Sequence, residues 1–98
     1  MAHQLAPQVV VELENIWQYL ATESSSLEIA DRVIESIADR FLLLSHHPYV
    51  GRPRPDLRPG LRSFPAGPYV IFYRIHGDDV LILHVVHSHR DIETILGK

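Results

Sequence analysis

Two apolar segments in the C-terminal half of the 98-residue sequence constrain its fold more than any other feature. Residues 69–75 (YVIFYRI) and 80–87 (VLILHVVH) are rich in β-branched and aromatic residues, which favour β-strands. Gly77 and Asp78 lie between them, and such a pair is typical of a tight hairpin turn. Because strands joined by a tight turn run antiparallel, the sequence predicts an antiparallel sheet built around this hairpin.

The N-terminal half predicts two amphipathic helices. The first has one apolar stripe at helical spacing, formed by Val9, Leu13, Ile16, Trp17 and Leu20. The second has a longer stripe, formed by Ala30, Val33, Ile34, Ile37, Ala38, Phe41 and Leu42. Ser25 and Glu28 suit a capping box at its start. It should end near His46 or His47, because Pro48 moves the preceding residue out of the α conformation.

The remaining segments complete the predicted fold. Residues 3–7 (HQLAP) suit an edge strand, and residues 61–64 suit a short strand within the proline-rich segment 48–68. The order is then strand, helix, helix and three strands, with residues 91–96 as a short helix or tail. We therefore expect one α+β domain over residues 1–98, in which a helical hairpin packs on one face of a small antiparallel sheet.

Composition excludes several classes of protein. Apolar residues make up 46% of the chain and charged residues 21%, as in an ordinary soluble globular protein. The absence of cysteine excludes disulfides and a thiolate nucleophile. The N-terminus lacks the pattern of a signal peptide, and no apolar run approaches the roughly 18–20 residues that cross a bilayer. These observations predict a cytoplasmic protein without a membrane partner.

The histidines near the end of the chain do not match a metal or catalytic site. In a strand, His87 and His89 share a face while His84 points the other way, so the three do not converge. Two histidines fall short of the three or four ligands that zinc takes. Ser88 points away from His87 and His89, which excludes a serine–histidine–aspartate triad, and the glycines form no phosphate-binding loop. We therefore expect neither a metal nor a cofactor.

Positive charge is concentrated in the middle of the chain. The formal net charge is −3, yet residues 47–77 contain five arginines against Asp56 alone. Prolines 53, 55 and 59 favour an extended backbone there, and stiffness lowers the entropy cost of presenting the arginines to a partner. Guanidinium groups suit phosphate or carboxylate ligands. Two interpretations stay open from the residues alone: a contact surface for a target, or a loop that forms salt bridges with the acidic helices of its own domain.

The order of several short motifs resembles the ParE/RelE superfamily of bacterial type II toxin–antitoxin toxins. They are P-x-x-G-R (48–52), LRPGLRS (57–63), YVIFYR (69–74) and VVHSHRD (85–91). Upstream, LENIWQYLATES and IADRVIESIADRFLLLSHHP are similar to the helical hairpin of that family. The resemblance spans nearly the whole chain.

This resemblance implies one of two activities. RelE-like toxins cleave mRNA at the ribosome, whereas ParE-like toxins act on DNA gyrase and block replication. RelE-like toxins are strongly basic and have a tyrosine near the C-terminal end, but this chain has one lysine, at its last position, and no tyrosine after Tyr73. The ParE-like branch is therefore the closer match. It implies a cytoplasmic gyrase inhibitor that a cognate antitoxin neutralises, without cofactor or catalytic residues. Alternatives are a ribosome-dependent endoribonuclease and a degenerate, non-toxic protein that still binds an antitoxin.

The charge pattern and the resemblance together predict which side chains contact the target. They are the basic residues of the middle and the end of the chain: Arg52, Arg54, Arg58, Arg62, Arg74, His87, His89 and Arg90. Under the endoribonuclease alternative, the catalytic candidates would be Arg62, Arg74, His87, His89 and Arg90. We expect His87, His89 and Arg90 to lie beside the arginine-rich loop.

Overall fold

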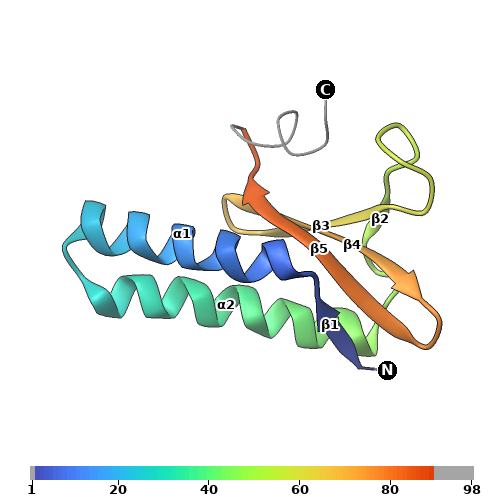
Figure 1. Cartoon of the computed structure of the whole chain (residues 1–98), viewed down its shortest axis with the longest axis horizontal. Helices are drawn as coiled ribbons and strands as arrows, with labels where there is room; N and C mark the ends of the chain where they lie inside the picture. The colour runs from blue at the N-terminus through green and yellow to red at the C-terminus, as the bar shows by residue number, and fades with distance from the viewer. Residues whose placement is uncertain (1, 90–98) are drawn as a thin grey trace.

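The computed structural model describes residues 2–89, which form two helices and five strands (Figure 1). The elements are β1 (His3–Leu5), α1 (Pro7–Ser24), α2 (Leu27–His46), β2 (Arg52–Pro53), β3 (Arg62–Ala66), β4 (Tyr69–His76) and β5 (Asp79–His87). The tail or helix that we predicted over residues 91–96 lies outside the described residues. Neither helix of residues 2–89 combines the length and the apolar composition needed to cross a bilayer.

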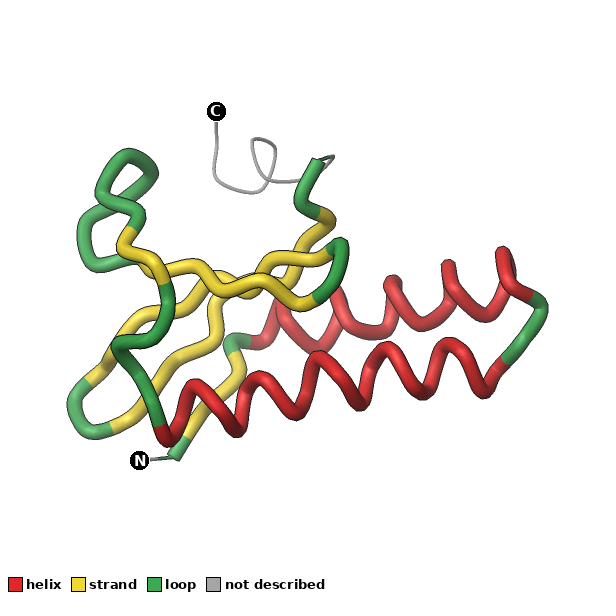
Figure 2. The backbone as a smooth tube through the Cα atoms, turned by 180° about the vertical axis from the view of Figure 1, so that it is seen from behind, coloured by secondary structure: helices red, strands yellow, loops and turns green. Residues whose placement is uncertain are grey.

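The predicted α+β fold is confirmed, with two differences in the sheet. The two-residue strand β2 lies in the segment where we predicted a loop with only one short strand, and the pairing of β1 is not antiparallel. The strand order is β1-β5-β4-β3-β2, and all neighbours are antiparallel except β1, which runs parallel to β5. A parallel pair needs a long crossover connection, and here the chain forms both helices after β1 and before it reaches the other four strands. Figure 2 shows both helices on one side of the sheet, with their connecting loop beyond the ends of the strands.

The helical hairpin turns one residue later than we predicted. Ser25, not Ser26, was the expected cap of the second helix, but Ser25 ends α1 in a left-handed conformation with φ of 54°. The Oγ of Ser26 accepts the hydrogen bond from the Ile29 amide at 3.2 Å, which makes Ser26 the cap of α2. Three consecutive serines offer equivalent hydroxyls, so composition could not distinguish them. Trp17 Nε1 donates to Asp31 Oδ1 at 2.8 Å and joins the two helices.

The main core lies between the helices and the sheet. Its fully buried side chains include Val9, Ile37, Leu44, Ile71, Tyr73, Val80, Ile82 and Val85. Leu42, which we placed on the apolar face of the second helix, is instead 54% exposed. A smaller cluster of Leu61, Phe72 and Val86 lies on the helix-free face of the sheet, where Leu57 of the loop after β2 packs against it.

Beyond the end of β1, side chains of α1 form hydrogen bonds with backbone groups along the edge of β5. An extra residue at Leu83 shifts the register of β5 against β4, because Phe72 pairs with His84 while Tyr73 pairs with Ile82. Gln8 Nε2 donates to the Leu83 carbonyl at 3.0 Å. Glu12 accepts from the Val85 amide at 2.9 Å, and its other carboxylate oxygen lies 2.8 Å from His84 Nδ1. His84 is thus a half-buried, hydrogen-bonded histidine, as predicted.

Candidate target-binding surface

The register of the sheet divides the arginines between its two faces. Arg52 pairs with Ser63, which pairs with Phe72 on the helix-free face. Since alternate residues of a strand share a face, Arg74 lies on that face too. Arg62 instead pairs with Tyr73, a core residue on the helix side. The predicted target-binding arginines therefore do not form one continuous surface.

Arg62 supports the turn between α2 and β2. Its Nη1 donates to the Gly51 carbonyl at 2.7 Å and to the Tyr49 carbonyl at 3.3 Å. Its guanidinium carbon also lies 5.1 Å from the centroid of the Tyr49 ring, within cation–π range. The guanidinium that we considered for phosphate binding is thus already engaged with its own chain. An Arg62→Ala variant would disturb this turn and would not be a clean test of catalysis.

Tyr73 supports the same turn from beneath. Its hydroxyl donates to the Pro48 carbonyl and accepts from the Gly51 amide, both at 2.9 Å. A Cβ on residue 51 would lie 2.6 Å from Cε1 and 2.8 Å from Cζ of Tyr73, so only glycine fits. Together, Arg62 and Tyr73 hold the backbone of the Pro48–Gly51 turn through four hydrogen bonds.

Burial of Tyr73 has a consequence for alkaline stability. Burial raises the pKa of Tyr73 above its ordinary value of about 10, while the Gly51 amide and the charge of Arg62 lower it to a smaller extent. Because the folded state holds this proton more tightly, stability is fully present below the unfolded pKa near 10 and falls as pH rises above it. We expect alkaline titration, followed by phenolate absorbance, to show a delayed component. Tyr73→Phe should remove it; an unchanged curve would contradict the assignment.

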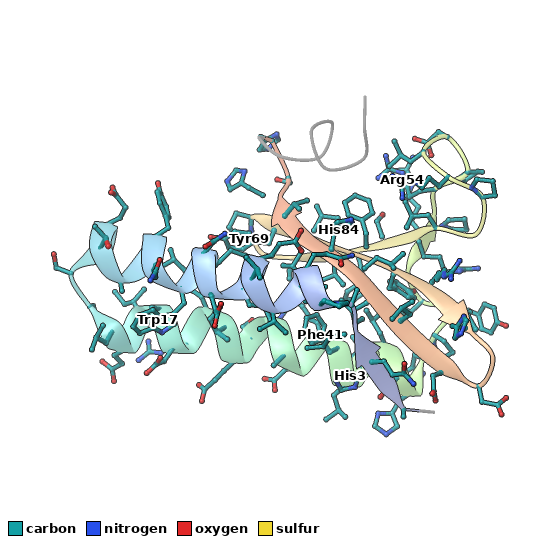
Figure 3. All side chains as sticks on the ribbon, in the orientation of Figure 1. His3, Trp17, Phe41, Arg54, Tyr69 and His84 are labelled. Atoms are coloured by element: carbon teal, nitrogen blue, oxygen red, sulfur yellow. The ribbon has the colours of Figure 1, made fainter. Side chains whose placement is uncertain are left out.

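The loop after β2 is held by its own ion pair. Arg54 donates to both carboxylate oxygens of Asp56, at 3.2 and 3.3 Å, and this contact is the main reason that the pKa of Asp56 is lowered. Figure 3 shows Arg54 on this loop, away from Trp17 and Phe41 of the helices. Within residues 2–89, no ion pair joins the arginine-rich segment to an acidic helix residue. The structure thus does not support the interpretation that this loop forms salt bridges with the helices.

The histidines do not lie beside the arginine-rich loop, contrary to our expectation. His87 pairs with Tyr69, whereas Arg62 pairs with Tyr73, four residues further along β4. Four residues of strand span roughly 13 Å, so His87 lies at the Tyr69 end of β4, well apart from Arg62 near the middle of that strand. His87 Nδ1 accepts from the His89 amide at 3.2 Å. Arg90 lies outside the described residues.

No catalytic or metal-binding cluster forms among the described candidates. Arg62 lies on the helix side, Arg74 on the opposite face, and His87 at the Tyr69 end of β4. Residues 2–89 contain no group of three or more His, Cys, Asp or Glu side chains that could hold a metal ion. The described candidates Arg62, Arg74 and His87 therefore do not converge on one point of the sheet.

Exposed apolar side chains form a second feature that the charge pattern did not reveal. On the helical hairpin and β1, large apolar residues with 37–61% exposure are Leu5, Val10, Val11, Tyr19, Leu27, Ile29, Leu42 and Leu43. In the Pro48–Gly51 turn, Tyr49 is 71% and Val50 is 51% exposed. From the sequence, we predicted this turn only as part of a stiff loop. The available signal was a pair of apolar residues between Pro48 and Gly51.

Comparison with known proteins gives consistent matches over most of the chain. The model of the family "ParE toxin of type II toxin-antitoxin system, parDE" matches residues 4–92. Toxin ParE3 of Caulobacter vibrioides is 38% identical over 76 residues, which cover 78% of this chain and 76% of that protein. Toxin ParE1 of the same organism is 30% identical over 95 residues, 97% of each chain.

Two further relatives bear on the alternatives. Toxin RelE3 of Caulobacter vibrioides is 33% identical over 86 residues, which cover 87% of this chain and 91% of that protein. A chain from the solved structure "Chromosomal ParDE TA system from P. aeruginosa" superposes with a TM-score of 0.78, covering 89% of this chain and 95% of that chain. Sequence identity to it is 20%, so this likeness shows the fold.

Proposed function

This chain belongs to the ParE toxin family of type II toxin–antitoxin systems, and we propose that it inhibits DNA gyrase in the cytoplasm until a cognate antitoxin neutralises it. The main support for gyrase inhibition over RNA cleavage is that Arg62, Arg74 and His87 are dispersed over both faces of the sheet and along its length. Cleavage by a ribose hydroxyl needs a base, an acid and cations around one phosphate. The net charge of −3 also disfavours docking on ribosomal RNA.

The exposed apolar residues at the β1 end of the helical hairpin support an antitoxin site. The Trp17–Asp31 hydrogen bond sets the register of the two antiparallel helices. Counting eleven residues back from Trp17 and eleven forward from Asp31 brings Ala6 level with Leu42. Leu5, Val10 and Leu42, which are 37%, 48% and 54% exposed, therefore lie toward the same end of the hairpin. An amphipathic antitoxin segment could bury them, as apolar helix faces do in grooves.

Leu42→Asp is expected to weaken antitoxin binding at least tenfold, because it places a carboxylate in an apolar contact. The Kd of the purified toxin–antitoxin pair measures the effect. Leu27→Asp is the matched control: Leu27 is 61% exposed on the same helix, fifteen residues or roughly 22 Å away. Equal effects of both variants, or no effect of Leu42→Asp, would contradict the placement of the site.

A supercoiling assay with purified gyrase tests the proposed activity. We expect the chain to inhibit gyrase and the antitoxin to relieve that inhibition. The 33% identity to a RelE toxin makes mRNA cleavage on ribosomes the second activity to assay. Cleavage without gyrase inhibition would establish the endoribonuclease alternative. Antitoxin binding without either activity would identify a degenerate, non-toxic homologue.

A further inference from the structure

The Pro48–Gly51 turn combines a highly exposed surface with a firmly held backbone. Tyr49 is the most exposed of the large apolar side chains in residues 2–89, and Val50 beside it is half exposed. Yet Arg62 and Tyr73 make four hydrogen bonds to the carbonyls and the amide of this turn. The two neighbouring core strands thus hold an exposed aromatic residue in a defined position.

This arrangement is typical of a binding surface. Holding an exposed tyrosine buries little apolar area within the chain, so the fold gains little from it. In an interface, by contrast, an ordered tyrosine adds contact area at low entropic cost. Tyrosine and arginine are also the residue types enriched among those that dominate binding energy. Arg62 lies against the Tyr49 ring, and the 71% exposure leaves most of the side chain open to a partner.

Charge around the turn indicates the chemistry of that partner. Residues 40–55 contain Arg40, Arg52 and Arg54 but no aspartate or glutamate. Arg54 is paired with Asp56, whereas Arg52 is exposed and makes no ion pair with a described residue. A nucleic-acid surface would need several free cations close together. The turn itself carries two exposed apolar side chains and no cation, and Arg52 directly after it in the sequence is exposed, which instead fits a protein pocket with carboxylates at its rim.

We propose that the Pro48–Gly51 turn is the surface through which this chain binds its target protein, with Tyr49 entering an apolar pocket and Arg52 meeting a carboxylate at its edge. The inference rests on the proposed function, since gyrase is the target protein that it names. Arg62 and Tyr73 are positioning residues that hold the turn in its binding conformation.

The test compares Tyr49→Ala with Tyr19→Ala, since Tyr19 is also a half-exposed tyrosine but lies on α1. Tyr49→Ala should raise the concentration needed for half-inhibition of gyrase supercoiling at least tenfold, while Tyr19→Ala should change it less than twofold. Arg52→Glu should weaken inhibition as well, and added salt should weaken the inhibition of gyrase by the wild-type chain. Circular dichroism and antitoxin Kd should be unchanged in Tyr49→Ala, which separates target binding from folding.

The outcomes distinguish this inference from the proposed function. Equal inhibition by the wild-type chain and Tyr49→Ala would overturn the inference and leave gyrase as the target. No inhibition by the wild-type chain would overturn the gyrase proposal. Growth arrest on induced expression of the wild-type chain and of Tyr49→Ala would then test whether the turn contacts a different target. Arrest that Tyr49→Ala abolishes would retain the turn as the target contact; equal arrest, or none from either chain, would overturn it. Tyr49-dependent binding to a short DNA duplex would show the partner class to be wrong.

Discussion

Gly51→Ala is expected to lower the free energy of unfolding by about 3 kcal/mol, because its Cβ would overlap the ring and hydroxyl of Tyr73. Tyr73 is fully buried, so its ring cannot move aside without disturbing the main core. The two hydrogen bonds of its hydroxyl, to Pro48 and Gly51, would be lost or lengthened. For a domain of this size, the melting temperature should fall by roughly 12–24 °C.

The control for Gly51→Ala is the adjacent Val50→Ala, which removes an exposed side chain and should change stability by no more than about 0.5 kcal/mol. Thermal and urea unfolding of both variants give the comparison. Similar melting temperatures for Gly51→Ala and the wild-type chain would show that the turn is not packed against Tyr73 as described. The same result would remove the structural basis for an ordered Tyr49.

Glu12→Ala is expected to lower the free energy of unfolding by about 2–3 kcal/mol. One carboxylate of α1 serves two groups of β5, the amide of Val85 and the ring of His84. Its removal leaves both without these partners in a half-buried site next to the register shift at Leu83. Loss of this contact should loosen the end of β5 beyond β1, which amide hydrogen exchange of Val85 would report.

Glu14→Ala provides the matched control, since Glu14 is an exposed glutamate on the same helix. It should leave both the melting temperature and the exchange rate of Val85 nearly unchanged. If the two variants unfold alike, the Glu12 carboxylate does not support the edge of β5. Glu12→Gln separates the two contacts further, because an amide oxygen can still accept from Val85.

Local patterns were enough to predict most elements of the fold. Each of these patterns depends only on residues close together in the sequence. They are the apolar periodicities of 9–20 and 30–42, the hairpin turn at Gly77 and the end of the second helix before Pro48. The parallel pairing of β1 with β5, and the bonds of Gln8 and Glu12 next to the extra residue at Leu83, join residues 72–77 apart in the sequence. Such contacts leave no spacing rule in a single sequence, and neither does the choice among three serines at the helical turn.

The candidate site was less predictable than the fold for a related reason. Charge counting identified the arginine-rich segment, but only register assigns Arg62 to the helix side and Arg52 and Arg74 to the opposite face. The supporting role of Arg62 depends on the carbonyls of Tyr49 and Gly51, which lie thirteen and eleven residues away in the sequence, respectively. Tyr49 was overlooked because an isolated loop tyrosine carries no periodic signal.

Pulse labelling of DNA and protein synthesis after induced expression in a bacterium tests the central claim most directly. If the chain inhibits gyrase, DNA synthesis falls first, cells form filaments, and co-expression of the antitoxin prevents both effects. Early loss of protein synthesis with mRNA cut at ribosomes, while DNA synthesis continues, would contradict the account and make this chain an endoribonuclease.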